Sequence, residues 1–229
     1  MKVWLFDYDL TLYGAEERYV LDSLDHRISL FVQKTVGGDF ESAHKIRTDY
    51  LEKFGTTLAG LMTMNATDPD EFFDFIHEPE YLTYPKKAPE KLALLLSLQG
   101  PRFVFTNGRH DWSEAGMAHM GIDSAIDGVF DLKMMDWEGK PHESAYVKME
   151  RWLAQKLPAM EPSRLLPGWN GAMPADKREI VLLEDSLRNL EPAHARGWTT
   201  VFVNPADEAP DWVDFHIPHL LDLPGSLIA

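Results

Sequence analysis

Short apolar runs alternate along this chain with longer segments whose apolar residues recur at helical spacing. The runs predict strands at 2–6, 102–105, 129–132, 180–183 and 200–203. Short runs that are apolar at nearly every position, as these are, are typical of parallel strands covered by helices on both faces of a sheet. The alternation therefore predicts an α/β fold, with a Rossmann-like, doubly wound parallel sheet at its core.

The predicted helices between the first two strands have no strand among them. Their patterns cover residues 16–35, 39–53, 57–64 and 68–77. We expect residues 15–85 to form a small α-helical cap inserted into an α/β core, which consists of residues 1–14 and 86–229. Further helices are predicted at 89–98, about 111–120, 142–157 and 187–196, and a long loop from Pro158 to Asp176.

Composition restricts the class of partner. The chain has 229 residues, a net charge of −15 and no cysteine. The length suits one large domain or a domain with a small appendage, and the absence of cysteine excludes disulfides and thiolate metal sites. The acidic balance argues against nucleic-acid polymers and anionic membranes, and the apolar stretch 92–98 is too short to span a bilayer. We expect a cytoplasmic monomer or homodimer that acts on a small metabolite.

Polar residues follow the predicted strands at the points where ligands bind in open parallel sheets, beyond the carboxyl ends. An ordinary turn explains each segment taken alone. Together they supply carboxylates, a hydroxyl, an amide and a lysine, which are groups that can hold Mg²⁺ against a phosphate. The segments are Asp7-Tyr8-Asp9-Leu10-Thr11, Thr106-Asn107-Gly108, Lys140-Pro141 and Glu184-Asp185-Ser186.

These four segments resemble the motifs of the haloacid dehalogenase-like phosphohydrolase superfamily, in the subclass with a helical cap between the first and second motifs. That family begins with Asp-x-Asp-x-Thr, as at residues 7–11, and ends its next motif strand with Thr or Ser, as at Thr106. Its third motif is a lysine commonly followed by proline, as at Lys140, and its fourth is an acidic pair, as at 184–185. The resemblance covers essentially the whole chain.

Two stretches are similar to the pyrimidine 5′-nucleotidase branch of that superfamily. One is residues 50–61, YLEKFGTTLAGL, and the other is residues 184–190, EDSLRNL. The resemblance implies that cap residues line the substrate pocket, and our candidates are Tyr50, Phe54, Thr56, Thr57 and Leu58.

The resemblance also implies roles for the two aspartates of the first motif. Asp7 is expected to attack phosphorus and form an aspartyl-phosphate. Asp9 is expected to protonate the leaving oxygen and later to deprotonate the water that hydrolyses the intermediate.

The remaining motif residues are expected to bind the metal and the phosphoryl group. The resemblance assigns Mg²⁺ to the Asp7 carboxylate, the backbone carbonyl of Asp9, Asp185 and Glu184. It assigns the phosphoryl oxygens to Thr106, the backbone of Asn107 and Lys140, which would neutralise charge in the transition state.

The leading expectation is therefore hydrolysis of a pyrimidine nucleoside monophosphate such as UMP or CMP. A phosphatase for sugar phosphates or other small metabolites and a phosphomutase are alternatives. A haloacid dehalogenase would lack the second aspartate, so Asp9 argues against it. A non-catalytic module that binds a phosphorylated ligand would be expected to have lost a key motif residue, and none is missing.

Overall fold

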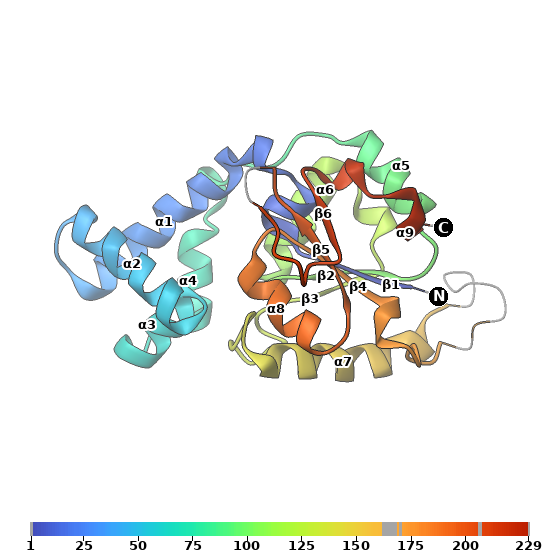
Figure 1. The fold of residues 1–229 in the computed structure, drawn as a ribbon. Helices are drawn as coiled ribbons and strands as arrows, with labels where there is room; N and C mark the ends of the chain where they lie inside the picture. The colour runs from blue at the N-terminus through green and yellow to red at the C-terminus, as the bar shows by residue number, and fades with distance from the viewer. Residues whose placement is uncertain (1, 162–168, 170, 206–207, 229) are drawn as a thin grey trace.

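Six parallel strands form one sheet at the centre of the molecule (Figure 1). The computed structural model describes residues 2–161, 169, 171–205 and 208–228. The spatial order of the strands is β3-β2-β1-β4-β5-β6. The strands are β1 (Val3–Phe6), β2 (Arg102–Phe105), β3 (Gly128–Phe130), β4 (Ile180–Glu184), β5 (Thr199–Val203) and β6 (Phe215–Ile217). The predicted α/β class with a parallel sheet is confirmed.

The strand order reverses beside β1. The chain passes from β1 through β2 to β3 on one side, and then returns to place β4 on the other side of β1. Phe6 pairs with Val104 of β2 and with Leu183 of β4, so these three strands end within one residue of the same level. Ligands of open α/β sheets bind at such a reversal, beyond the carboxyl ends. The register therefore brings the segments after β1, β2 and β4 together.

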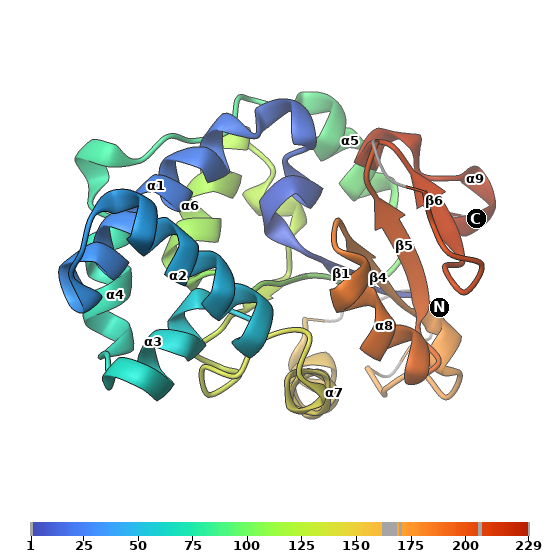
Figure 2. The ribbon, with the colours of Figure 1, turned by 60° about the vertical axis from the view of Figure 1, so that its left-hand side comes forward.

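Helices cover both faces of the sheet, as Figures 1 and 2 show. Val3 and Leu5 of β1 belong to the buried cluster under α7 (Glu143–Lys156) and α8 (Leu187–Ala195). Trp4 and Phe6 point the other way, into the cluster beneath α5 (Pro89–Ser97), α6 (His110–Met120) and the short α9 (Gly225–Ile228). Alternate residues of one strand thus build two separate apolar layers, which makes the sheet doubly wound.

Four of the helices that lie between β1 and β2 in the sequence form a lobe beside the sheet, in blue and cyan at the left of Figure 1. They are α1 (Tyr19–Val36), α2 (Phe40–Phe54), α3 (Thr57–Asn65) and α4 (Pro69–Ile76). Side-chain oxygens of Asp39, Thr56 and Asp68 cap the first turns of α2, α3 and α4. Phe31 and Phe72 meet edge to face at 5.2 Å in the apolar interior of the lobe. We refer to residues 15–85 as the cap.

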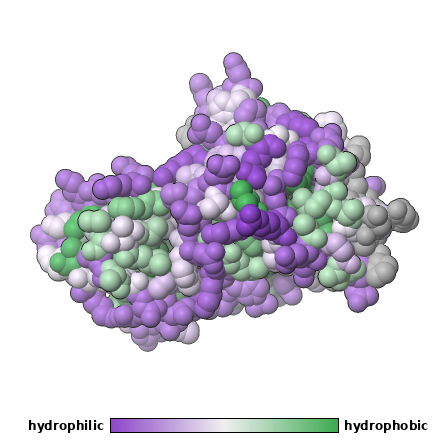
Figure 3. All heavy atoms as spheres, turned by 90° about the horizontal axis from the view of Figure 1, so that it is seen from below, coloured by the Kyte–Doolittle hydropathy of each residue, from purple (hydrophilic) through white to green (hydrophobic). Residues whose placement is uncertain are grey.

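The surface is mainly polar. Figure 3 shows hydrophilic residues over much of the face seen from below, with apolar atoms gathered on the lobe of α1–α4 at the left. Among the described residues, no helix combines the length and the apolar character needed to cross a membrane.

The boundaries of most predicted strands agree with the structure to within one residue, and the main differences concern β3 and β6. β3 ends at Phe130 rather than 132, because the Asp131 carboxylate accepts hydrogen bonds from the backbone of His110 and Met134 in the turn that follows. β6 was not predicted, since its three residues include a histidine and form no apolar run. Of the predicted loop from Pro158 to Asp176, residues 162–168 and 170 lie outside the described residues.

Candidate active site

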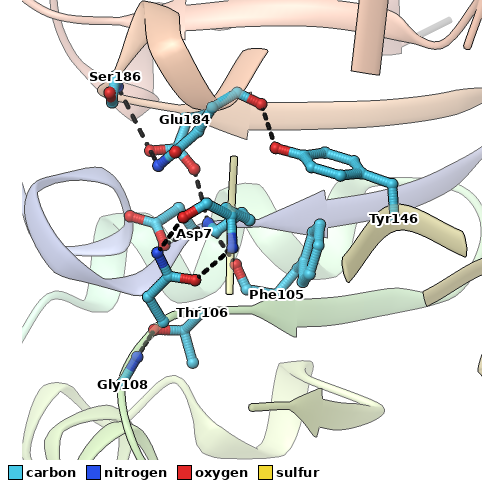
Figure 4. A network of polar contacts seen from close by, with 10 residues as sticks. Asp7, Phe105, Thr106, Gly108, Tyr146, Glu184 and Ser186 are labelled. Carbon is cyan, nitrogen blue, oxygen red and sulfur yellow. Dashed lines mark hydrogen bonds and ion pairs between the residues drawn. The ribbon is translucent and has the colours of Figure 1, made fainter. Parts of the chain in front are cut away.

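A fully buried lysine lies at the centre of the site. Lys140 precedes α7, and its Nζ donates to Asp7 Oδ1 at 2.8 Å, to Glu184 Oε2 at 2.6 Å and to the Phe105 carbonyl at 2.7 Å. Figure 4 shows Asp7 between Glu184 on one side and the turn of Thr106 and Gly108 on the other. Although burial lowers the pKa of Lys140, the charges of Asp7 and Glu184 raise it above its ordinary value. Lys140 is therefore a permanent cation that joins the ends of β1, β2 and β4.

Asn107 holds Lys140 in place. Its side-chain oxygen accepts from the Lys140 backbone N–H at 2.8 Å, and its amide nitrogen donates to the Lys140 carbonyl at 2.8 Å. The sequence analysis assigned the backbone of Asn107 to the phosphoryl group and gave its side chain no role. An asparagine after a strand gives no sequence signal for its partner, since Asn is common in turns.

Three carboxylates meet beside Lys140. Asp7, Glu184 and Asp185 each offer an oxygen, and these oxygens all lie within 4.8 Å of one another. Burial and the charge of Glu184 raise the pKa values of Asp7 and Asp185. When ionised, the three groups carry two more negative charges than Lys140 offsets. A cluster of carboxylate oxygens with that excess of negative charge fits a divalent cation such as Mg²⁺.

The fourth motif also orients its own glutamate. Asn189 Nδ2 donates to Glu184 Oε1 at 3.1 Å, and the Ser186 backbone N–H donates to the same oxygen at 3.3 Å. With Lys140 on Oε2, both oxygens of Glu184 have partners. Glu184 is thus fixed in one position at the floor of the site.

Thr106 directly follows β2 and lies in the same site. Its backbone N–H donates to the Phe130 carbonyl at 3.1 Å, and its hydroxyl accepts from the Gly108 N–H at 2.9 Å. The turn is tight: a Cβ on Gly108 would lie 3.3 Å from Thr106 Oγ1 and 3.8 Å from Asp9 Oδ2. The hydroxyl and the second aspartate of the first motif therefore border the same small space.

Asp9 lies at a kink in the turn that follows β1, where the backbone of Asp9 and Leu10 is not helical and Leu10 has a φ of +59°. Tyr13 Oη donates to Asp9 Oδ1 at 2.7 Å, and Trp112 Nε1 donates to the same oxygen at 3.3 Å. Burial raises the pKa of Asp9, and these two hydrogen bonds oppose that shift. The sequence analysis missed Tyr13 and Trp112, because neither belongs to a motif.

A cavity of about 420 Å³ lies between this cluster and the cap. Every core residue that the sequence analysis selected contributes to its lining, namely Asp7, Asp9, Thr106, Asn107, Lys140, Glu184 and Asp185. The structure therefore brings together residues from the ends of three strands and from the segment before α7.

The predicted cap residues divide into two groups. Thr56, Thr57 and Leu58 line the cavity, whereas Tyr50 and Phe54 do not. Tyr50 packs against Gly60, where a Cβ would lie 2.4 Å from its ring, and its hydroxyl donates to Asn65 at 3.1 Å. The ring of Phe54 lies against that of Tyr50, at 5.8 Å and nearly perpendicular. These two rings are thus part of the packing of α2.

The cap supplies charged residues to the cavity that sequence reasoning missed. Arg47 of α2 forms an ion pair with Asp25 of α1, and Arg18 Nη2 lies 4.0 Å from the same carboxylate. All three line the cavity, among apolar residues of α1 and α4 such as Leu24, Ile28 and Phe72. No motif marks Arg47 or Asp25, and helical spacing alone does not tell which face meets the core.

No protein-family model matches the sequence. Solved structures similar to this chain over nearly its full length include a HAD phosphatase from Thermococcus onnurineus. It is 20% identical, with a TM-score of 0.59, over 97% of this chain and 96% of that one.

Two further structures resemble the chain to a similar extent. An L-2-haloacid dehalogenase from Xanthobacter autotrophicus, with chloropropionic acid covalently bound, is 18% identical over 97% of this chain and 96% of that one, with a TM-score of 0.52. The putative HAD-hydrolase YfnB from Bacillus subtilis, bound to magnesium, is 15% identical over 99% and 98%, with a TM-score of 0.54. Together with the strand order, these likenesses show that the chain has the haloacid dehalogenase-like fold.

Proposed function

We propose that the protein is a Mg²⁺-dependent phosphomonoester hydrolase that acts through an aspartyl-phosphate on Asp7. The observation that carries the proposal is that the two aspartates of the first motif have different hydrogen-bond partners. Asp7 is hydrogen-bonded to buried Lys140, whereas Asp9 is bonded to the neutral donors Tyr13 and Trp112. This difference supports Asp7 as the nucleophile and Asp9 as the proton carrier.

The second aspartate favours a phosphomonoester over a haloalkanoic acid. A halide leaves carbon as a stable anion and needs no proton, so a dehalogenase has no task for Asp9. An alcohol is a poor leaving group unless its oxygen is protonated as the bond to phosphorus breaks. A carboxyl group held by neutral donors in a buried position is suited to that task.

In the first step, a carboxylate oxygen of Asp7 attacks phosphorus while the bond from phosphorus to the leaving oxygen breaks. Asp9 gives its proton to that oxygen, so the alcohol departs neutral. In the second step, Asp9 removes a proton from a water molecule as the water attacks phosphorus. The bond between Asp7 and phosphorus breaks and free phosphate is released. Asp7 is then again a carboxylate, and Asp9 is again protonated.

Asp7, Glu184, Asp185 and the backbone carbonyl of Asp9 would hold the Mg²⁺ ion. When bound, the ion neutralises charge on the carboxylates and on the phosphoryl oxygens. Thr106 and the backbone of Asn107 would bind the remaining phosphoryl oxygens. The Lys140 ammonium, whose three N–H groups donate to Asp7, Glu184 and Phe105, would neutralise charge on them. These contacts matter because phosphoryl transfer is catalysed mainly by positioning and charge neutralisation.

For the substrate, we propose a pyrimidine nucleoside monophosphate. The cavity volume of about 420 Å³ lies in the range typical of sites for small ligands. Apolar walls such as Ile28 and Phe72 suit a planar base better than a sugar, which carries hydroxyls on every side. The pair of Arg47 and Asp25 offers donors and an acceptor to the polar edge of the base.

The experiment is a release assay with and without Mg²⁺ on UMP, CMP, purine nucleoside monophosphates, sugar phosphates and 2-chloropropionate. We expect Mg²⁺-dependent release of phosphate, with pyrimidine nucleotides preferred. Much faster release from sugar phosphates would refute the proposed substrate, and phosphoryl transfer to a second sugar would indicate a mutase. Release of chloride without release of phosphate would refute the proposed reaction.

A further inference from the structure

The two hydrogen-bond donors of Asp9 both reach the same oxygen, Oδ1. The indole N–H of Trp112 can only donate, so Oδ1 accepts from it. The Tyr13 hydroxyl, at 2.7 Å, supplies the second bond. With both lone pairs of Oδ1 engaged, a proton on Asp9 has its place on Oδ2.

Oδ2 is the oxygen of Asp9 that faces the second motif. The position of a Cβ on Gly108 would lie 3.8 Å from Oδ2, 3.3 Å from Thr106 Oγ1 and 3.6 Å from Trp112 Cδ1. Oδ2 therefore borders the space beside the Thr106 hydroxyl. A proton held on Oδ2 therefore lies near Thr106, the residue proposed to bind the phosphoryl group.

The indole of Trp112 is held by the cap. It lies in α6 with a side chain only 3% exposed. Its ring stacks with His77 at the end of α4, at 5.4 Å and 17°, and with Tyr84 at 5.5 Å and 29°. His77 and Tyr84 both belong to the cap, whereas Tyr8, which meets the indole edge-on at 6.4 Å, belongs to the core. The direction of the indole N–H thus depends on where the cap lies.

From these contacts we infer that Trp112 is a positioning residue, which the cap holds through His77 and Tyr84 and which keeps the proton of Asp9 on Oδ2. When the cap docks on the core, it then also directs the proton of Asp9 towards the leaving group. An undocked cap releases the indole, and Asp9 loses one of the two bonds that direct its proton. The inference rests on the proposed function, since it requires Asp9 to protonate a leaving alcohol.

The test compares two leaving groups in the Trp112→Phe variant, which keeps an aromatic ring and removes the N–H. Benzyl phosphate releases an alcohol that needs a proton, whereas p-nitrophenyl phosphate releases a stable phenolate that needs little help. The measured quantity is kcat/KM, which includes the steps up to departure of the leaving group and omits hydrolysis of the intermediate. We expect a loss of about tenfold or more with benzyl phosphate and of less than about threefold with p-nitrophenyl phosphate.

Two further variants make the result specific. Tyr13→Phe removes the other donor and should produce the same difference between the two substrates, which keeps the inference testable if Trp112→Phe does not fold. Trp137→Phe is the matched control: its ring contacts Phe73 of the cap at 6.1 Å, but it is not one of the donors to Asp9. We expect that control to treat both substrates alike.

Equal losses on both phosphates in an otherwise active protein, or no loss at all, would overturn the positioning role and leave the proposed function standing. A folded wild-type protein that releases phosphate from neither compound, nor from any phosphate in the release assay, would overturn both. The two failures are therefore distinguishable.

Discussion

Lys140 and Asp7 form an ion pair of 2.8 Å between residues 133 positions apart in the chain. The Lys140 side chain is 0% exposed, and its ammonium also contacts Glu184. Buried charges are costly unless they are paired, so removing one partner leaves the other uncompensated. The contact therefore links the stability of the fold to the chemistry of the site.

Replacement of Lys140 tests this link. In Lys140→Met, Asp7 and Glu184 lose their shared cation, and we expect the free energy of unfolding without metal to fall by about 3 to 5 kcal/mol. Phosphate release should also be lost. The measurement is urea unfolding, with Lys133→Met as the control, because Lys133 pairs with Asp70 at a surface where both side chains are 61% exposed. Equal losses in the free energy of unfolding for the two substitutions would show that Lys140 contributes no more to stability than an exposed lysine.

Asp185 should have opposite effects on stability with and without metal. Without metal, burial and the charge of Glu184 raise the pKa of Asp185 to about 9, so Asp185→Asn removes a carboxyl group that is costly to ionise, and the variant should be at least as stable as the wild type. With Mg²⁺ at a hundred times its dissociation constant, the wild type should gain about 2.7 kcal/mol, and the variant should gain far less. Unfolding curves with EDTA and with Mg²⁺ measure both. Asp211→Asn, at an exposed position, should gain as much as the wild type.

Arg47 should determine affinity for the distal part of the substrate and leave the chemistry unchanged. In Arg47→Met, we expect KM for UMP to rise about tenfold, a typical cost for a lost hydrogen bond to a charged group. Turnover of p-nitrophenyl phosphate, which has no base, should stay within about twofold of the wild type in the same preparation. Parallel losses on both substrates would show that Arg47 supports the fold of the cap rather than the substrate.

His77 should make stability depend on pH. Burial lowers the pKa of His77 to about 4 from its ordinary 6.5, although the charge of Asp111 opposes the shift. The unfolded chain therefore binds more protons between pH 6.5 and 4, and the contribution of neutral His77 to stability is lost as the pH falls through that window.

In His77→Phe, which keeps a ring against Trp112, the decline in the free energy of unfolding between pH 6.5 and 4 should be smaller than in the wild type by about 3 kcal/mol. Urea unfolding at several pH values measures the difference between variant and wild type. Two curves of the same shape would contradict a buried, neutral His77.

The residues at the strand ends could be predicted from the sequence, because each follows a short apolar run. A parallel sheet then brings the carboxyl ends of neighbouring strands together. This rule is sufficient to predict that Asp7, Thr106 and Glu184 lie in one site. Lys140 could be assigned to the site only from the resemblance to the family motifs, since a lysine before a proline is more often an exposed turn residue.

The contacts made by helices could not be predicted in the same way. Helical spacing identifies an apolar face but not the element it meets, so nothing in the sequence pairs Trp112 with Asp9 or Arg47 with Asp25. For the same reason, Tyr50 and Phe54, which were expected in the pocket, lie outside its lining and pack within the cap and against Gly60. Side chains that depend on the docking of one helix on another require the structure.

The covalent role of Asp7 is the central claim, and mass spectrometry of the Asp9→Asn variant tests it most directly. With p-nitrophenyl phosphate and Mg²⁺, the good leaving group lets the first step proceed, while loss of the base at Asp9 slows hydrolysis of the intermediate. After an acid quench, we predict a phosphoryl group on the peptide that contains Asp7, and none when Asp7 is also changed to Asn. Continued release of p-nitrophenol beyond one equivalent by a protein in which Asp7 stays unmodified would contradict the account.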